Sequence, residues 1–310
     1  MTSEWDSVVV GGGAAGLSAG LVLGRARRRT LVLDVGGQSN RVAEGIGGLL
    51  GNDRRRPAEF YAAGRQELSA HEDLELRDIE ALRGERRPDG FALELADGTE
   101  IDTRTVLLAT GMDYRYPEVP GARERWGRSV FHCPFCHGWE VRGQDLAVLG
   151  SDEMAVHRAL LLRSWSDSVT LLSDGGELAA EGAERLAGAG VEVDDRAVAS
   201  LEGPGSSLTS VVFEDGSELA LGGLLVGITL HRRSDLPDQL GAARGPASPI
   251  TTEAIEVDAM ANAGVPGLYA AGDLLAHAPS VASAISTGHF AAAMIVNALG
   301  PPRRLSTASR

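Results

Sequence analysis

The stretch Ser7-Val8-Val9-Val10-Gly11-Gly12-Gly13-Ala14-Ala15-Gly16 decides the fold of this 310-residue chain. Its apolar first half predicts a short buried strand, and the glycines that follow predict a tight turn into a helix over Leu17–Arg27. A second strand, Thr30–Leu33, ends in Asp34. Glycines spaced G-x-G-x-x-G between a strand and a helix, with an acid after the next strand, are typical of a dinucleotide-binding βαβ unit.

Each residue of this unit has a distinct expected role. Gly11 makes the turn, Gly13 lets the backbone approach a pyrophosphate, and Gly16 lets the helix and the strand pack closely. The N-terminus of the helix faces the phosphates, because its backbone N–H groups have no partner inside the helix. Asp34 takes the ribose hydroxyls. The N-terminal unit is therefore expected to bind a dinucleotide.

A second strand–turn–helix–strand pattern begins at Asp145–Leu149. Its turn, Gly150–Ala155, fits the first and third glycine positions, but the second position holds Asp152. A carboxylate there adds bulk and negative charge where a pyrophosphate needs bare backbone. The next strand is followed by Ser173-Asp174-Gly175, with no arginine to hold a ribose phosphate. We expect the fold unit to be repeated here with a degraded nucleotide site.

The last part of the chain returns to the first unit. A buried strand ends in Gly272-Asp273, and Pro279–Leu299 predicts a long apolar helix. The sequence thus predicts an α/β protein with two Rossmann-like, three-layer dinucleotide-binding domains. The first domain comprises residues 1–115 and 245–310, and the inserted second domain comprises residues 116–244.

Composition and charge narrow the class of protein. The net charge is −14, which argues against nucleic acid or an anionic membrane as the main partner. Hydrophobic residues make up 43%, enough for two cores, yet no stretch of about 18 apolar residues predicts a membrane span. The acidic start runs directly into a strand, unlike a signal peptide. We expect a cytoplasmic protein.

Both cysteines lie in Phe131-His132-Cys133-Pro134-Phe135-Cys136-His137-Gly138-Trp139-Glu140. Four interpretations are open: unrelated structural thiols, a zinc site, a c-type haem attachment and a redox dithiol. Zinc needs four ligands, and no second Cys or His pair at finger spacing accompanies the first. Attachment of a c-type haem needs an exported protein, and the acidic start of this chain is unlike a signal peptide. The spacing favours a redox dithiol, whose thiolate forms more readily than that of a free cysteine. No metal is expected.

Several motifs together resemble the low-molecular-weight thioredoxin reductase family. They are Gly11–Gly16, Gly36-Gly37-Gln38, Ala109-Thr110-Gly111, the Cys-x-x-Cys inside the second dinucleotide-like domain, and Ala271-Gly272-Asp273. The resemblance covers nearly the whole chain and implies a homodimeric FAD protein of the FAD/NAD(P)-linked disulfide oxidoreductase type. It places FAD against the following residues: Gly11, Gly13, Gly16, Asp34, Gly37, Gln38, Thr110, Gly111, Gly272, Asp273, Ser280 and Val281. It also implies that Cys136 faces the flavin C4a atom and that Cys133 exchanges with outside thiols.

Two departures point to one branch of this family. Asp152 and Ser173-Asp174 stand where the reductases carry a glycine-rich NADPH loop and a basic cluster. His137 stands where an aspartate commonly follows the second cysteine. A retained FAD site and dithiol without a nucleotide site is similar to the flavin-dependent dithiol oxidases of natural-product pathways, of the gliotoxin and holomycin type. Those enzymes pass electrons to oxygen.

The leading hypothesis is therefore an FAD-dependent dithiol oxidase. Cys133 and Cys136 would close an intramolecular disulfide in a small dithiol, and O2 would become H2O2. His137, or else His132, would act as the base, since histidine titrates near neutral pH; each could instead be only a polar residue at the site mouth. The alternative is an NAD(P)H-dependent, thioredoxin reductase-type disulfide reductase with a thioredoxin-like partner. A third hypothesis is an idle FAD-binding protein, which the retained dithiol argues against.

Overall fold

The computed structural model describes residues 5–275 and 279–301, so the acidic start at 1–4 and the tail from 302 lie outside it. The chain divides into two compact units. Unit 1 comprises Met1–Ser39, Ala58–Tyr114 and Leu230–Arg310, and unit 2 comprises Asn40–Pro57 and Arg115–Thr229.

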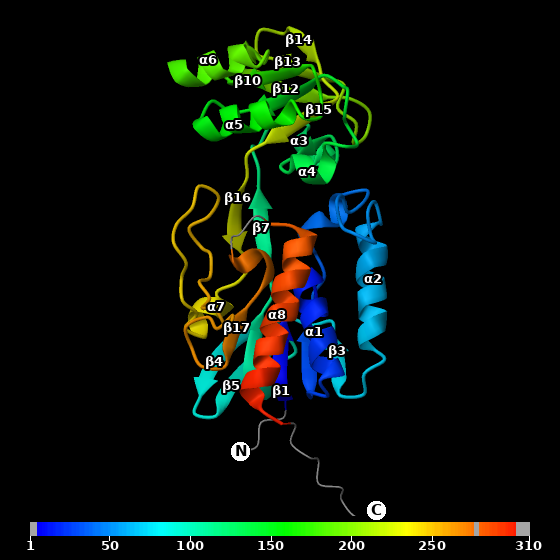
Figure 1. The fold of residues 1–310 in the computed structure, drawn as a ribbon, viewed down its shortest axis with the longest axis vertical. Helices are drawn as coiled ribbons and strands as arrows, with labels where there is room; N and C mark the ends of the chain where they lie inside the picture. Colours follow the sequence, from blue (N-terminus) through cyan, green and yellow to red (C-terminus); the bar gives the residue numbers. More distant parts are fainter. Residues whose placement is uncertain (1–4, 276–278, 302–310) are drawn as a thin grey trace, which may run out of the picture. The chain divides into compact units, whose positions relative to one another are not determined.

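Unit 1 is built on a seven-stranded sheet with strand order β3-β2-β1-β6-β5-β4, in which β17 also pairs with β6 (Figure 1). Its strands are β1 (Trp5–Val10), β2 (Thr30–Leu33), β3 (Leu74–Arg77), β4 (Ala81–Arg87), β5 (Gly90–Leu95), β6 (Glu100–Leu108) and β17 (Leu268–Ala270). Its helical segments are α1 (Ala14–Arg25), α2 (Pro57–Leu68), α7 (Leu236–Gln239), α8 (Val281–Leu299) and η2 (Gly272–Leu275), while the 3-10 helix η1 (Ser39–Val42) lies at the boundary with unit 2. Strands β3, β2, β1, β6 and β17 are parallel, as a dinucleotide-binding fold requires.

The parallel strands of unit 1 end at one edge of the sheet. Val10 pairs with Leu33 and with Leu108, and Leu108 pairs with Ala270. Residues that directly follow β1, β2, β6 and β17 therefore meet at this edge, although they come from distant parts of the sequence. Ligands of open parallel sheets bind outside such carboxyl ends.

The chain changes its sheet partner after Arg77, because β3 pairs with β2 whereas β4 pairs with β5. Strand β6 is continuous from Glu100 to Leu108. Its first half pairs antiparallel with β5 and its second half pairs with β17, which joins the hairpin to the main sheet.

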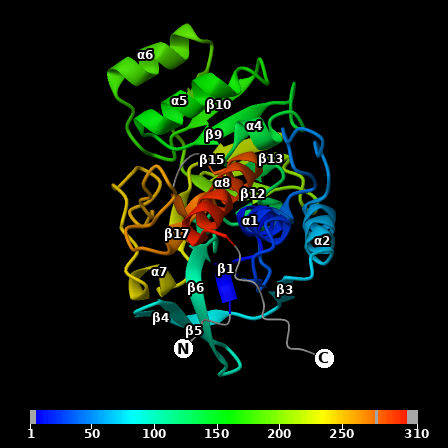
Figure 2. The same cartoon turned by 60° about the horizontal axis from the view of Figure 1, so that its bottom comes forward.

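Helix α8 packs along α1, as Figures 1 and 2 show. A Cβ atom at Gly288 would lie 2.1 Å from the carbonyl oxygen of Ala15, so the two helices approach very closely. By length and mean hydropathy, α8 is long and apolar enough to cross a membrane, contrary to the sequence expectation. Core helices of globular domains meet the same criterion, and α8 packs a buried stripe against α1.

Unit 2 holds a second parallel sheet, with strand order β11-β10-β9-β15-β8. Its strands are β8 (Val130–Phe131), β9 (Leu146–Leu149), β10 (Val169–Leu172), β11 (Glu192–Asp194) and β15 (Gly223–Val226). Strands β12 (Val198–Glu202), β13 (Ser210–Phe213) and β14 (Glu218–Ala220) form an antiparallel sheet. The helices are α3 (Ala122–Arg125), α4 (Pro134–His137), α5 (Glu153–Leu162) and α6 (Ala180–Gly188). Helix α5 packs against α6, β9 and β10 (Figure 2). The expected α/β fold, with a core of parallel strands in each unit, is confirmed.

The division of the chain differs from the predicted domains at Arg115, which belongs to unit 2, and in two longer segments. Residues 40–57 were assigned to the first domain but belong to unit 2, where Arg128 donates to Glu44 at 2.8 Å. Residues 230–244 were assigned to the inserted domain but belong to unit 1. Besides the crossings after Ser39 and Pro57, the chain passes between the units in strands β7 (Met112–Arg115) and β16 (Thr229–Arg232), which pair with each other.

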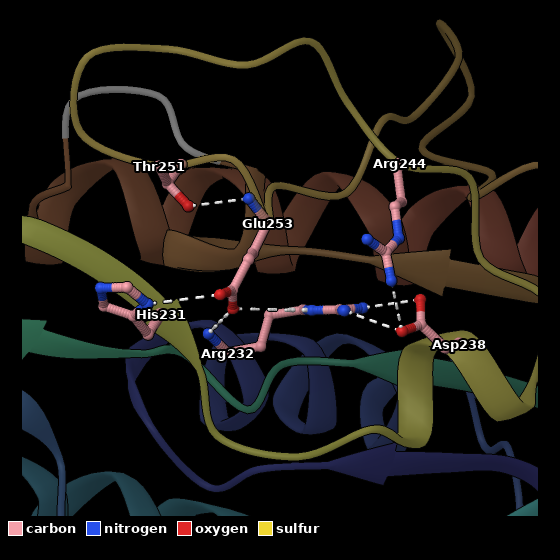
Figure 3. Close-up of polar contacts among 6 residues, drawn as sticks. All are labelled: His231, Arg232, Asp238, Arg244, Thr251 and Glu253. Carbon is pink, nitrogen blue, oxygen red and sulfur yellow. Dashed lines mark hydrogen bonds and ion pairs between the residues drawn. The ribbon is translucent and has the colours of Figure 1, made fainter.

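A polar network holds the returning segment after β16 (Figure 3). Arg232 donates two hydrogen bonds of 2.8 Å to the carboxylate of Asp238, which also accepts from Arg244 at 2.8 Å. Glu253 accepts from the backbone N–H of Arg232 at 2.7 Å, and its other oxygen contacts Nδ1 of His231 at 3.3 Å. These contacts hold the segment together, and the side-chain oxygen of Gln239 accepts from the N–H of Gly84 at 2.9 Å, which joins the segment to β4 of unit 1.

Candidate active site

The two cysteines are joined by a disulfide at the start of a short helix. Cys133 is the N-cap residue of α4, and Pro134 occupies the first helical position, where a missing N–H costs nothing. The N–H groups of Cys136 and His137 both donate to the carbonyl of Cys133 at 3.2 Å. The Cα atoms of the cysteines are 5.3 Å apart. The turn thus holds the two sulfur atoms close enough to form a disulfide.

A glycine that the sequence did not single out supports this turn. A Cβ atom at Gly47 would lie 2.2 Å from the carbonyl oxygen of Cys136. The loop after residue 44 therefore packs directly against the backbone of the active-site turn, and only glycine fits at this point. Gly47 and Cys136 are far apart in the sequence, so no local pattern could have revealed this contact.

Both histidines of the motif are half-buried and neutral at pH 7. Burial lowers the pKa of His132 to about 4, and the nearby His137 and Arg158 lower this pKa further. Burial alone lowers the pKa of His137 to about 4. A neutral imidazole can accept a proton, so either ring can act as a base without first losing its own proton.

Aromatic side chains surround the motif. The ring of His132 stacks on Trp126 with centroids 5.8 Å apart, and Trp126 stacks on Tyr116 at 4.0 Å. Phe135, between the cysteines, is 69% exposed, and Trp139 is 59% exposed. Large exposed aromatic side chains beside a reactive group offer contact area to an apolar ligand.

The glycine loop of unit 1 has the geometry that its spacing predicts. Gly11 has φ +111°, a conformation that side chains rarely adopt, and a Cβ atom there would lie 2.2 Å from the carbonyl oxygen of Ala109. A Cβ atom at Gly16 would lie 1.7 Å from the carbonyl oxygen of Gly11. Around Gly13, by contrast, the nearest atom is a Gln38 carbon at 3.8 Å. Gly13 caps α1 without a side-chain hydrogen bond, which leaves open space beside free backbone amides.

The acid after β2 closes one side of this loop. Asp34 is buried and accepts hydrogen bonds from the N–H groups of Gly12 at 3.3 Å and Gly36 at 3.0 Å. Arg65 forms an ion pair with the same carboxylate at 2.9 Å. Gln38 donates to the carbonyl of Gly12, while its Oε1 atom is buried without a partner among the described residues. An orphaned acceptor beside a carboxylate suits the hydroxyl groups of a ribose.

The other predicted cofactor residues follow β6 and β17 or begin α8. Thr110 and Gly111 follow β6, and Gly272 and Asp273 follow β17 at the same sheet edge. The hydroxyl of Tyr114 donates to the Asp273 carboxylate at 2.8 Å, and burial raises the pKa of both groups. The sequence did not indicate this Tyr114 contact.

Two predicted residues lie at turns of the chain around this edge. Gly37 has φ +75°, and its carbonyl accepts from Arg233 at 2.8 Å. Ser280 is the N-cap of α8 and accepts from the N–H of Ser283 at 3.1 Å, so that the helix begins at Val281. All twelve predicted cofactor residues therefore lie in unit 1, whereas the cysteines and histidines lie in unit 2. The bare amides at Gly13, the acid at Asp34 and the orphaned Gln38 oxygen fit a dinucleotide such as FAD.

Two aspartates at the second glycine-like loop accept hydrogen bonds from backbone N–H groups of unit 2. Asp152 is the N-cap of α5, and its Oδ1 atom accepts from the N–H of Ala155 at 2.7 Å. Asp174, after β10, accepts from the N–H of Val198 at 2.7 Å. Arg196, the arginine of the neighbouring segment, is bound to the carboxylate of Asp194.

Comparisons with known proteins agree with this architecture. The family model described as pyridine nucleotide-disulphide oxidoreductase matches residues 5–289. The chain is 34% identical over 306 residues to "Thioredoxin reductase tcpT" of Claviceps purpurea (strain 20.1), covering 93% of this chain and 92% of that protein. Two crystal structures resemble it closely. An oxidoreductase from Agrobacterium tumefaciens has a TM-score of 0.89 and 33% identity, covering 95% of this chain and 98% of that one. The structure of HlmI has a TM-score of 0.88 and 36% identity, covering 96% and 94%.

The match extends over both sheets and over the dithiol, so it is not a likeness of one dinucleotide-binding unit alone. It agrees with the resemblance that the glycine loops and the Cys-x-x-Cys motif indicated. The chain belongs to the pyridine nucleotide-disulphide oxidoreductase family and is a thioredoxin reductase-like, FAD-binding disulfide oxidoreductase.

Proposed function

We propose that this enzyme is a dithiol oxidase, which closes an intramolecular disulfide in a small dithiol and passes the electrons to O2. The observation that carries the proposal is the hydrogen bond between Asp152 and Ala155. In a dinucleotide site, the first amides of the helix bind the pyrophosphate. Here the Asp152 carboxylate already accepts a hydrogen bond from one of these amides, that of Ala155, and it brings a negative charge to the same position.

The electrostatic cost to a nucleotide is large. Two like charges about 4 Å apart repel by roughly 4 kcal/mol at an effective dielectric constant of about 20. A loss of that size weakens binding by about three orders of magnitude. The Asp174 carboxylate and the neutralised Arg196 remove the attraction that a phosphorylated ribose would need. These features favour electron entry from a dithiol over electron entry from NAD(P)H.

The chain's own residues can carry out the thiol chemistry. A substrate thiolate attacks the sulfur of Cys133, which breaks the Cys133–Cys136 bond and releases Cys136 as a thiolate. The second substrate thiolate then attacks the substrate sulfur of the mixed disulfide and releases Cys133. The product leaves as an intramolecular disulfide, and the cysteine pair has gained two electrons.

A base must take the protons of the substrate thiols, whose pKa is normally about 8.5. His137 is our first choice and His132 our second, because both rings are neutral at pH 7. The exposed rings of Phe135 and Trp139 offer contact to the body of a small apolar substrate.

When bound in unit 1 by the residues of the glycine loop, Asp34 and Gln38, FAD supplies a two-electron acceptor that can reduce O2 to H2O2. The balance is then one dithiol and one O2 consumed for each disulfide and each H2O2 formed. A homodimer working in the cytoplasm is part of the same proposal, supported by the family resemblance and by the acidic composition.

Oxygen uptake tests the proposal. Purified, FAD-loaded protein mixed with dithiothreitol in air should consume O2 and form H2O2 in a one-to-one ratio with oxidised dithiol. The Cys133→Ser variant should show only the background rate. The competing function, an NAD(P)H-dependent reductase, predicts instead that NADPH and a thioredoxin are turned over rapidly while oxygen uptake stays at background.

A further inference from the structure

Arg158 lies at the carboxyl edge of the parallel sheet in unit 2. It belongs to α5 and is half-buried. Gly227 directly follows β15, and a Cβ atom there would lie 3.2 Å from Nη1 of Arg158. The guanidinium group therefore sits against the backbone at the end of β15, where a side chain on residue 227 would crowd it.

The strand register brings the dithiol to the same edge. Leu225 of β15 pairs with Phe131 of β8, and neighbouring strands are about 4.8 Å apart. His132 and Cys133 directly follow Phe131 at the end of β8, and Gly227 directly follows the end of the neighbouring strand β15. The charge of Arg158 is close enough to His132 to lower the pKa of that ring. Arg158 is thus a cation near His132, the residue that precedes Cys133.

This guanidinium group has no hydrogen-bond or ion-pair partner within residues 5–275 and 279–301. The other half-buried arginines of that part of the chain all donate to an oxygen atom of the protein. A half-buried charge without a partner is costly, so such groups are usually paired. The chain has 43 aspartate and glutamate residues, yet in the part of the chain that the structure describes none of them pairs with this arginine.

We propose that Arg158 binds a carboxylate of the dithiol substrate. The inference rests on the proposed oxidase function and names its substrate class: a small dithiol with an apolar body and one carboxylate. The planar guanidinium fork matches a carboxylate in two parallel hydrogen bonds. The exposed rings of Phe135 and Trp139 supply contact to the apolar body.

Dihydrolipoate and dihydrolipoamide form a matched pair of probes, because they share the dithiol and the carbon chain and differ in one carboxylate. The second-order rate constant for anaerobic flavin reduction of the FAD-loaded enzyme is measured for each by stopped flow, so that even slow reduction gives a value. A charged hydrogen bond of this kind predicts a preference of the wild-type enzyme for the acid by about 10- to 100-fold.

Variants assign this preference to one side chain. The ratio of the two rate constants should fall to about one in Arg158→Gln and below one in Arg158→Glu, where the new carboxylate repels the acid. Arg158→Lys should recover part of the ratio. Arg163→Gln, at the far end of the same helix, is the control and should keep the wild-type ratio, because the partners of Arg163 all lie in its own loop, Ser166 and Asp167. Flavin loading reports whether each variant is folded.

Three results would overturn the inference. An unchanged ratio in Arg158→Gln would show that Arg158 does not distinguish the two probes. An equal loss with both probes, with the pH profile moved to higher pH, would mean that Arg158 stabilises a thiolate and not a carboxylate. If neither probe reduces the wild-type flavin, the oxidase function itself fails and the inference falls with it.

Discussion

The carboxylate of Asp152 accepts a hydrogen bond from the backbone N–H of Ala155 at 2.7 Å and so caps helix α5. The same residue stands at the position where a dinucleotide-binding loop needs a glycine. One side chain therefore closes the helix end that would otherwise bind a pyrophosphate. The cap has consequences for stability as well as for electron flow.

Removing this cap should destabilise unit 2. Asp152→Ala leaves the N–H of Ala155 without its partner and should lower the free energy of unfolding by about 1 kcal/mol. Asp152→Asn keeps an acceptor oxygen and should cost less. Chemical denaturation followed by circular dichroism measures both. Equal losses in the two variants would contradict the capping role.

A substitution in the glycine loop of unit 1 can abolish cofactor binding without preventing folding. The space around Gly13 is open, so Gly13→Glu should fold but should be colourless, because the added carboxylate occupies the place of the pyrophosphate. Gly188→Ala, also at an open position with ordinary backbone, is the control and should stay yellow. The ratio of flavin to protein absorbance measures the loading. Fully loaded Gly13→Glu protein would show that this loop does not hold FAD.

His137 should matter most near neutral pH. Its pKa of about 4 keeps it neutral throughout the working range, so His137→Gln removes a base that is always available. Oxidation of dithiothreitol at pH 7 should fall by about 10²-fold or more. The loss should shrink above about pH 9, where the substrate thiols ionise unaided. The exposed His157 offers a control: His157→Gln should keep the wild-type profile. A loss below about threefold at pH 7 would transfer the role of base to His132 or to solvent.

The two histidines also make stability depend on pH. In the unfolded chain each ring binds a proton below about pH 6.5, whereas in the folded protein it stays neutral down to about pH 4. The unfolded state therefore binds more protons within this window, and the free energy of unfolding should fall as the pH is lowered from 6.5 to 4. Urea unfolding at several pH values measures the slope. The double variant His132→Gln/His137→Gln should have a flatter curve; an identical slope would contradict the lowered pKa values.

The sequence was most informative where chemistry depends on neighbours along the chain. The turn at Gly11, the close packing at Gly16 and the acid at Asp34 follow from one strand–turn–helix unit, and the structure shows that geometry. The missing glycine at Asp152 was also evident from spacing alone. Its hydrogen bond to Ala155 was not, because capping depends on where the helix begins.

Contacts between distant segments could not be predicted from such patterns. The packing of Gly47 on the Cys136 carbonyl places residues 40–57 in unit 2, and nothing in the local sequence marks that loop. The position of Arg158 beside Gly227 depends on the strand order β9-β15-β8, which links segments far apart in the chain. Tyr114 likewise meets Asp273 across 159 residues.

The source of the electrons is the central claim, and anaerobic stopped-flow spectroscopy tests it most directly. The FAD-loaded enzyme is mixed with NADPH, with NADH or with dithiothreitol, each at millimolar concentration, and the flavin absorbance is followed. Because Asp152 closes the nucleotide loop, we predict that only the dithiol bleaches the flavin within seconds and that admitting air restores the yellow form with release of H2O2. Rapid bleaching by NADPH or NADH, with little by the dithiol, would contradict the oxidase function and favour a disulfide reductase.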